Sequence, residues 1–122
     1  MGIKKRDGGF VYLMHAVGTD LYKIGHSGNP HKRLYALNQQ SAVDIKLMHA
    51  FFVFNMLSAE EYFHDIFKKF RIRREWFALE ELQLQTLTSM KSENGSVERD
   101  IHYQVVMELK YFEKLKGARG NV

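Results

Sequence analysis

The 122 residues include no cysteine, are 45% hydrophobic and 26% charged, and carry 18 Lys and Arg against 14 Asp and Glu, a formal net charge of +4. The length is that of one domain with a core, the composition excludes a disordered chain, and the lack of cysteine excludes disulfides and thiolate metal sites. The small positive charge favours a polyanionic partner such as nucleic acid.

Residues 4–7 are all charged, and no apolar segment typical of a signal sequence follows them. Nowhere does an uninterrupted apolar run reach membrane-spanning length. We therefore expect a soluble, cytoplasmic protein without a membrane partner.

Two strands are predicted near the beginning of the chain. Residues 10–17 and 21–26 are rich in aromatic and β-branched side chains, and the Gly-Thr-Asp sequence at 18–20 between them is typical of a hairpin turn. The two strands should therefore pair side by side.

A short helix and a third strand are predicted next. Asn29 followed by Pro30 is a helix-start signal, and Leu34 and Leu37 continue at helical spacing to about Asn38. Residues 43–55 then form a long apolar and aromatic run. This run completes an expected antiparallel sheet of three strands.

A second helix is predicted from Ser58 to about Phe70, because Ser58 and Glu61 have the spacing of a capping box. At 100° per residue, one face of this helix presents Glu60, Phe63, His64 and Phe67. Glu61 falls on the opposite, solvated side. A carboxylate on an aromatic face is costly unless it is paired or bound to a metal, so Glu60 is the stronger functional candidate.

The rest of the chain predicts two further helices. Trp76 and Phe77 should anchor the chain to the core, and leucines at 79, 82 and 87 indicate a helix. Residues 92–96 form the clearest break, and residues 97–116 predict a final amphipathic helix. We assign residues 1–91 to the main domain and residues 92–122 to a linker and C-terminal helix of the same domain.

Three side chains suit phosphodiester hydrolysis, which needs a water nucleophile and positive charge at the phosphate. Glu60 could hold one hard divalent ion, Mg²⁺ or Mn²⁺, that keeps most of its waters. Arg33 could bind the phosphate with its planar fork of donors. Tyr12 could orient or deprotonate the water.

The order of these residues resembles the GIY-YIG nuclease superfamily. Phe10-Val11-Tyr12 and Lys23-Ile24-Gly25 stand where the two name-giving tripeptides are expected, ten residues apart. Arg33 follows Gly25 by eight residues, and Glu60 matches the metal-binding glutamate. The similarity runs from residue 10 to residue 77 and is closest to small phage and bacterial members with Tyr-Lys-Ile-Gly and Glu-Trp-Phe motifs.

The resemblance implies an α+β domain, with a three-stranded antiparallel sheet flanked by helices, that cleaves DNA with a single metal ion. It also implies a site whose catalytic residues are Tyr12, Lys23, Arg33 and Glu60, with Glu60 as the metal ligand. Supporting positions near this site are Tyr22, Gly25, His26 and His64. His64 is either a packed core histidine or a group that supports the site, and His26 and His31 suit the surface better than a metal site.

Lys23 departs from the superfamily pattern, which usually has a tyrosine there that is often assigned as the general base. A lysine with an ordinary pKa of about 10.4 is protonated at neutral pH and cannot serve as a base. Lys23 is therefore either a phosphate-binding cation or a base whose pKa is depressed by burial beside Arg33.

A cationic cluster follows the second helix and consists of Lys68, Lys69, Arg71, Arg73 and Arg74. It is either a solvated helix end, favoured by the helix dipole, or a nucleic-acid-binding track for phosphates. Glu75, next in the chain, is a weaker site candidate.

The sequence thus favours a metal-dependent endonuclease that acts on DNA, with RNA as the alternative substrate. A second interpretation is a nucleic-acid-binding module that keeps the fold and does not cut, which Lys23 supports. A third is a protein-interaction domain, in which the final helix forms a homodimer or partner surface through Val105, Val106, Leu109, Phe112 and Leu115.

Overall fold

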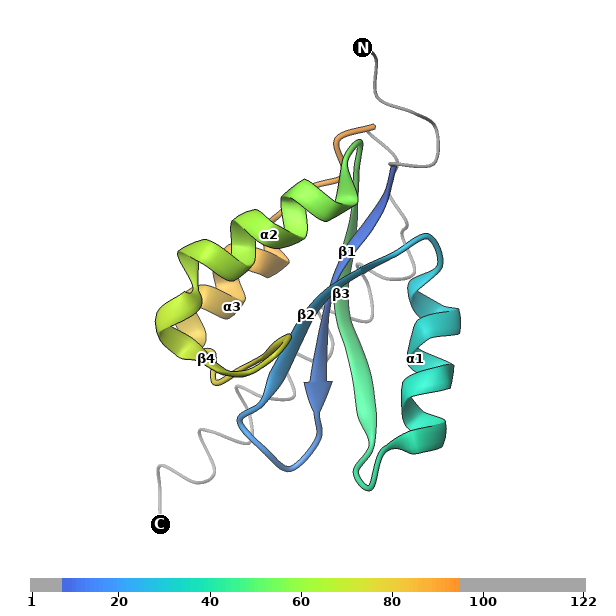
Figure 1. The fold of residues 1–122 in the computed structure, drawn as a ribbon, viewed down its shortest axis with the longest axis vertical. Coiled ribbons are helices and arrows are strands. Elements are labelled where there is room, and N and C mark those ends of the chain that lie inside the picture. Colours follow the sequence, from blue (N-terminus) through green and yellow to red (C-terminus); the bar gives the residue numbers. More distant parts are fainter. Residues whose placement is uncertain (1–7, 95–122) are drawn as a thin grey trace.

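A five-stranded antiparallel sheet with strand order β3-β1-β2-β5-β4 organises the computed structural model, which describes residues 8–94 (Figure 1). The strands are β1 (Gly9–Ala16), β2 (Tyr22–Ser27), β3 (Ile45–Val53), β4 (Arg71–Arg73) and β5 (Trp76–Phe77). The helices are α1 (Pro30–Gln40), α2 (Met56–Ile66) and α3 (Glu81–Thr88), with a 3₁₀ turn η2 (Lys68–Phe70) after α2. The predicted α+β class is confirmed.

The expected strand number was wrong, because β4 and β5 extend the sheet beyond β2. All three residues of β4 are exposed, and β5 has only two residues. Neither strand is long enough to show the alternation of polar and apolar residues that identifies a strand in sequence.

The two faces of the sheet are covered by different helices (Figure 1). On one face, α1 packs Leu34 and Leu37 against a cluster that contains Tyr12 and Met14. On the other face, residues of α2 and α3 complete the larger core cluster, whose members include Val11, Leu13, Ile24, Phe51, Phe63, Phe67, Phe77 and Leu87. Alternate side chains of β1 thus pack into two separate apolar layers, one on each face of the sheet.

The two predicted helix starts have different outcomes. Asn29 caps α1 as expected, since its side chain accepts a hydrogen bond from the Lys32 backbone N–H at 3.1 Å. The capping box predicted for α2 was wrong. Asn55 is the N-cap, and its side chain accepts a hydrogen bond from the Ser58 backbone N–H at 3.1 Å. The helix therefore begins at Met56, and Ser58 lies inside its first turn and not at the cap position. The α-helix also ends at Ile66, and the turn η2 follows.

The edge of β2 is the part of the sheet that positions the site. Strand β5 pairs with β2 only at Tyr22 and Lys23, and the Ile24 backbone N–H donates to the Glu75 carbonyl at 3.0 Å. Among the described residues, no strand pairs with the outer edge of β2 beyond this point. The second half of β2 therefore faces a region that α2 and the β4–β5 turn border.

No helix within residues 8–94 is long and apolar enough to cross a bilayer. The predicted helix at 97–116 and its proposed dimer surface lie outside the described residues. Of the predicted break at 92–96, residues 92–94 are described, and Ser92 and Glu93 hydrogen-bond to Phe52 at the end of β3.

Candidate active site

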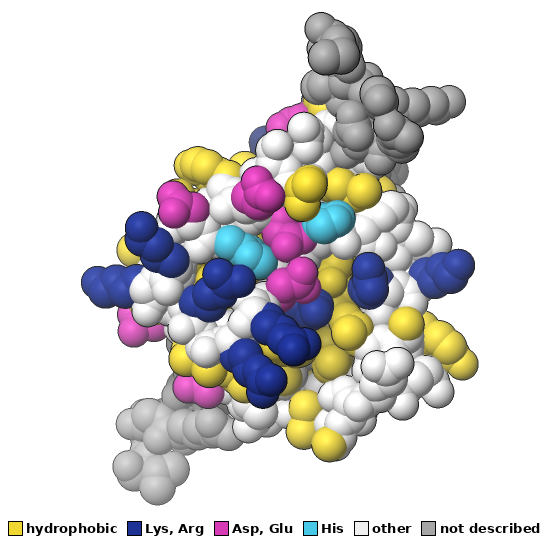
Figure 2. Space-filling model, in the orientation of Figure 1, with side chains coloured by type: hydrophobic (Ala, Val, Ile, Leu, Met, Phe, Trp, Pro, Cys, Tyr) yellow, Lys and Arg dark blue, Asp and Glu magenta, His cyan; other side chains and the backbone are white. Residues whose placement is uncertain are grey.

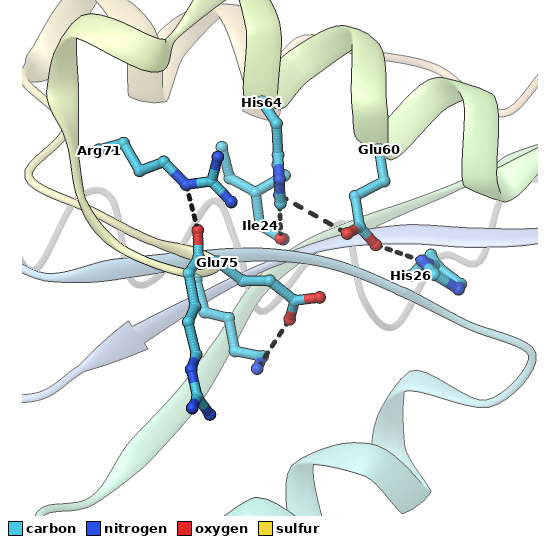
Figure 3. Close-up of polar contacts among 8 residues, drawn as sticks. Ile24, His26, Glu60, His64, Arg71 and Glu75 are labelled. Atoms are coloured by element: carbon cyan, nitrogen blue, oxygen red, sulfur yellow. Dashed lines mark hydrogen bonds and ion pairs between the residues drawn. The ribbon is translucent and has the colours of Figure 1, made fainter.

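Glu60 is a buried carboxylate on the inner face of α2, with only 7% of its surface exposed. It points toward β2, where His26 Nδ1 contacts its Oε2 atom (Figure 3). His64, one helical turn later, has its Nε2 atom 3.7 Å from Glu60 Oε1 and donates a hydrogen bond to the Ile24 carbonyl at 2.8 Å. The predicted placement of Glu60 and His64 on one inward face of the helix is confirmed.

The environment of Glu60 disfavours its charged form. Burial raises the pKa of its carboxyl, the hydrogen bond from His26 opposes that rise, and the negative charge of Glu75 adds to it. Glu60 is therefore a site where added positive charge is favourable.

Glu75 joins this site from the β4–β5 turn. Its Oε2 atom lies 2.8 Å from Lys23 Nζ, and the Lys23 ammonium lies 5.8 Å from the centre of the Trp76 ring. Burial alone would raise the pKa of Glu75, but the hydrogen bond and charge of Lys23 outweigh it, so the pKa is lowered overall. Glu75 is thus an ionised partner of Lys23.

Tyr12 reaches the site across β2 because Gly25 lies directly opposite it in the β1–β2 register. A Cβ atom at Gly25 would lie 2.3 Å from the Tyr12 hydroxyl oxygen and 2.4 Å from Cζ. Tyr12 is 2% exposed. Burial raises its pKa and the charge of Glu75 raises it further, whereas Arg33 lowers it. The phenol therefore stays protonated at neutral pH and is suited to donate a hydrogen bond.

Arg33 extends from α1 toward solvent. Its charge acts on Tyr12, so it contributes to the same electrostatic environment as Glu60 and Glu75. Figure 2 shows acidic side chains in the middle of this face, with histidine side chains beside them and lysine and arginine side chains around. The four predicted catalytic residues, Tyr12, Lys23, Arg33 and Glu60, are thus linked by contacts or by charge.

The remaining predicted positions differ in their surroundings. Tyr22 lies in the core beneath α2 and α3, where its ring stacks on His15 with centroids 4.5 Å apart. His31 is exposed. The cationic cluster is exposed on η2 and the β4–β5 hairpin, where Lys68 pairs with Asp65 at 3.8 Å and Arg71 Nε donates to the Arg74 carbonyl at 2.5 Å.

Sequence reasoning underestimated His26 and Glu75. The His26 side chain is 32% exposed yet contacts Glu60, which lies 34 residues away in the chain. Glu75 is brought in by a hairpin too short to show a pattern. The only signal for Glu75 was its place between a cationic run and two aromatic residues.

The donor set decides which ion the site suits. Within residues 8–94, no group of three or more His, Cys, Asp and Glu side chains is arranged to hold a metal ion. A site built on Glu60 therefore suits an ion that keeps most of its waters, as Mg²⁺ does, and not one that needs several protein ligands.

A family model for the T5orf172 domain matches residues 9–95. The chain belongs to the T5orf172 domain family. No curated protein and no solved structure matches it. The matched range of this T5orf172 domain contains every residue of the candidate site, from Tyr12 to Glu75.

Proposed function

We propose that this T5orf172 domain is a metal-dependent endonuclease of the GIY-YIG type that hydrolyses phosphodiester bonds in DNA. The observation that carries the proposal is Glu60, a buried carboxylate with a raised pKa at the open edge of β2. A divalent ion held there would supply positive charge at the scissile phosphate. The +4 net charge of the chain and the basic side chains around the site favour a polyanionic substrate.

The other side chains take roles that follow from their surroundings. Arg33, exposed on α1, binds a phosphate through its fork of donors. Lys23, whose ammonium group contacts the Glu75 carboxylate at 2.8 Å, acts as a second phosphate-binding cation. Tyr12, kept protonated by burial, orients a water or a phosphate oxygen through its hydroxyl group.

His26 is the best-placed group to accept a proton from the attacking water. Glu60 contacts its Nδ1 atom, and about a third of the side chain is exposed to solvent. A carboxylate that orients an imidazole in this way is the arrangement used for general-base catalysis.

The direct test is plasmid relaxation with Mg²⁺ or Mn²⁺ and with a chelator. The wild type should cleave only with metal, and Glu60→Gln should abolish cleavage while leaving DNA affinity unchanged or higher. Glu61→Gln removes the same charge from the exposed side of α2 and should cleave like the wild type. Loss of cleavage in Glu61→Gln with retention in Glu60→Gln would show that the two carboxylates are assigned wrongly.

The second candidate is a nucleic-acid-binding module that does not cut, and the Lys23–Glu75 pair favours it because the amine at this position is already engaged by a carboxylate. In that case DNA binding should be sensitive to salt, and no divalent ion should support cleavage. Lys23→Tyr restores the residue usual in the GIY-YIG superfamily. Inactivity of both wild type and Lys23→Tyr would leave the binding module as the function.

A further inference from the structure

The Glu75 side chain extends toward the same region as Glu60, the proposed metal ligand (Figure 3). It contacts Lys23 at 2.8 Å, and its charge affects the ionisation of both Tyr12 and Glu60. The charge of His64 in turn lowers the pKa of Glu75. A negative group therefore already occupies the point around which these side chains gather.

The backbone holds Glu75 at this point. Its carbonyl accepts the Ile24 N–H at 3.0 Å, and the preceding residue, Arg74, has a positive φ of 52°. Arg71 Nε stabilises the turn by donating a hydrogen bond to the Arg74 carbonyl at 2.5 Å. A residue other than glycine adopts this conformation only when its surroundings impose it, so the turn presents Glu75 in a defined place.

A phosphate that contacts Lys23 would lie next to Glu75, because the Glu75 carboxylate is 2.8 Å from Lys23 Nζ. Carboxylate and phosphate oxygens both accept charge-assisted hydrogen bonds from an ammonium group, so the two anions compete for the same donor. Two anions held side by side without a cation between them repel each other. A phosphate that binds Lys23 therefore meets less repulsion when Glu75 moves away from the ammonium group.

We propose that Glu75 is an internal competitor of the substrate, whose carboxylate occupies in the free protein the place beside Lys23 that a nucleic-acid phosphate takes on binding. This inference rests on the proposed phosphate site. It assigns Glu75 a regulatory role at that site, because the ion pair with Glu75 weakens the binding of a phosphate to Lys23.

Duplex binding measured without metal tests the proposal, since cleavage plays no part in it. The probe is a fluorescein-labelled 20-base-pair DNA duplex in EDTA, titrated at several salt concentrations. Glu75→Gln should tighten binding by about two- to fivefold, the range expected when one partly exposed ion pair no longer competes. The slope of log affinity against log salt should change little, because Lys23 neutralises the same phosphate in both complexes and only the competition in the free protein is removed.

Two comparisons separate this mechanism from a general change in charge. Glu61→Gln, which removes one negative charge from the exposed side of α2, should change affinity much less. In a Lys23→Met background, Glu75→Gln should produce no tightening, because the contested cation is gone. Glu75→Ser provides a second variant if Glu75→Gln proves poorly folded by circular dichroism.

Unchanged or weaker binding by folded Glu75→Gln and Glu75→Ser would overturn the proposal, as would equal tightening with and without Lys23, or no duplex binding by any variant. These outcomes differ from a failure of the proposed function. If the wild type cleaves plasmid and Glu75→Gln binds like it, only the competitor role is lost. If the wild type never cleaves and the tightening depends on Lys23, the competitor role stands on a binding module.

Discussion

The close approach of Gly25 to Tyr12 makes a quantitative prediction for Gly25→Ala. The added Cβ would lie 2.3 Å from the hydroxyl oxygen, 2.4 Å from Cζ and 2.9 Å from Cε1 of Tyr12. Since non-bonded carbon atoms pack at about 3.5 Å, the ring must shift by about 1 Å. Gly25 does not have a positive φ, so the effect comes from this clash and not from backbone strain.

The expected cost is about 1–3 kcal/mol of unfolding free energy, the usual range for overpacking a core. A displacement of about 1 Å in a positioned catalytic group can cost about 100-fold in rate, so cleavage should fall by about that factor. Urea denaturation and plasmid relaxation measure the two effects. Gly28→Ala is the matched control, because a Cβ there meets no atom within 4 Å; it should leave cleavage unchanged and raise stability by up to about 1 kcal/mol through the unfolded chain.

A double-mutant cycle with Tyr12→Ala isolates the contact. With the ring removed, Gly25→Ala should no longer destabilise the protein and should stabilise it by up to about 1 kcal/mol through the unfolded chain. If Gly25→Ala behaves like Gly28→Ala, or destabilises equally with and without the Tyr12 ring, the proposed crossing of β2 by Tyr12 is refuted.

Three further predictions concern stability. The pKa of Glu60 is raised in the folded protein, so the stabilising contribution of this carboxyl group is present below its unfolded pKa and lost as pH rises through its folded pKa. In urea denaturation, Glu60→Gln should be more stable than the wild type at pH 8, and this difference should vanish near pH 4. Equal stability of the two proteins at both pH values would contradict the raised pKa. Asn55→Ala should lower the free energy of unfolding by about 1 kcal/mol because it removes the cap of α2, and Ser58→Ala should lower it clearly less. If thermal melts give the reverse order, Ser58 and not Asn55 is the cap of α2. Arg74→Gly should keep stability or raise it by up to about 1 kcal/mol, because glycine adopts a positive φ freely. If the Arg74 side chain contacts a phosphate, the substitution should also flatten the slope of log affinity against log salt for duplex binding by about 0.9. A destabilised protein with an unchanged slope would assign Arg74 a structural role alone.

Local sequence was sufficient for much of the fold. The β1–β2 hairpin, the Asn29 cap of α1 and the inward face of α2 all arise from residues within a few positions of one another, where turn chemistry and side-chain periodicity act directly. The burial of Glu60 follows from the same periodicity, because its helix face also carries Phe63 and Phe67.

The start of α2 shows where local reasoning reached its limit. Asn55 and Ser58 are both acceptable caps, and either choice gives a helix with Glu60 inside. The structure places the cap at Asn55, so the helix gains a first turn and Ser58 supplies a backbone N–H to the cap.

Only the tertiary structure decided which groups surround Glu60. The His26 contact spans 34 residues, and Lys23 meets Glu75 because a two-residue strand pairs with β2 and ends there. Tyr12 reaches the same edge because strand register sets Gly25 opposite it. These contacts depend on register and on the end of a strand, which are properties of pairing between distant segments and leave no periodic trace in either segment alone.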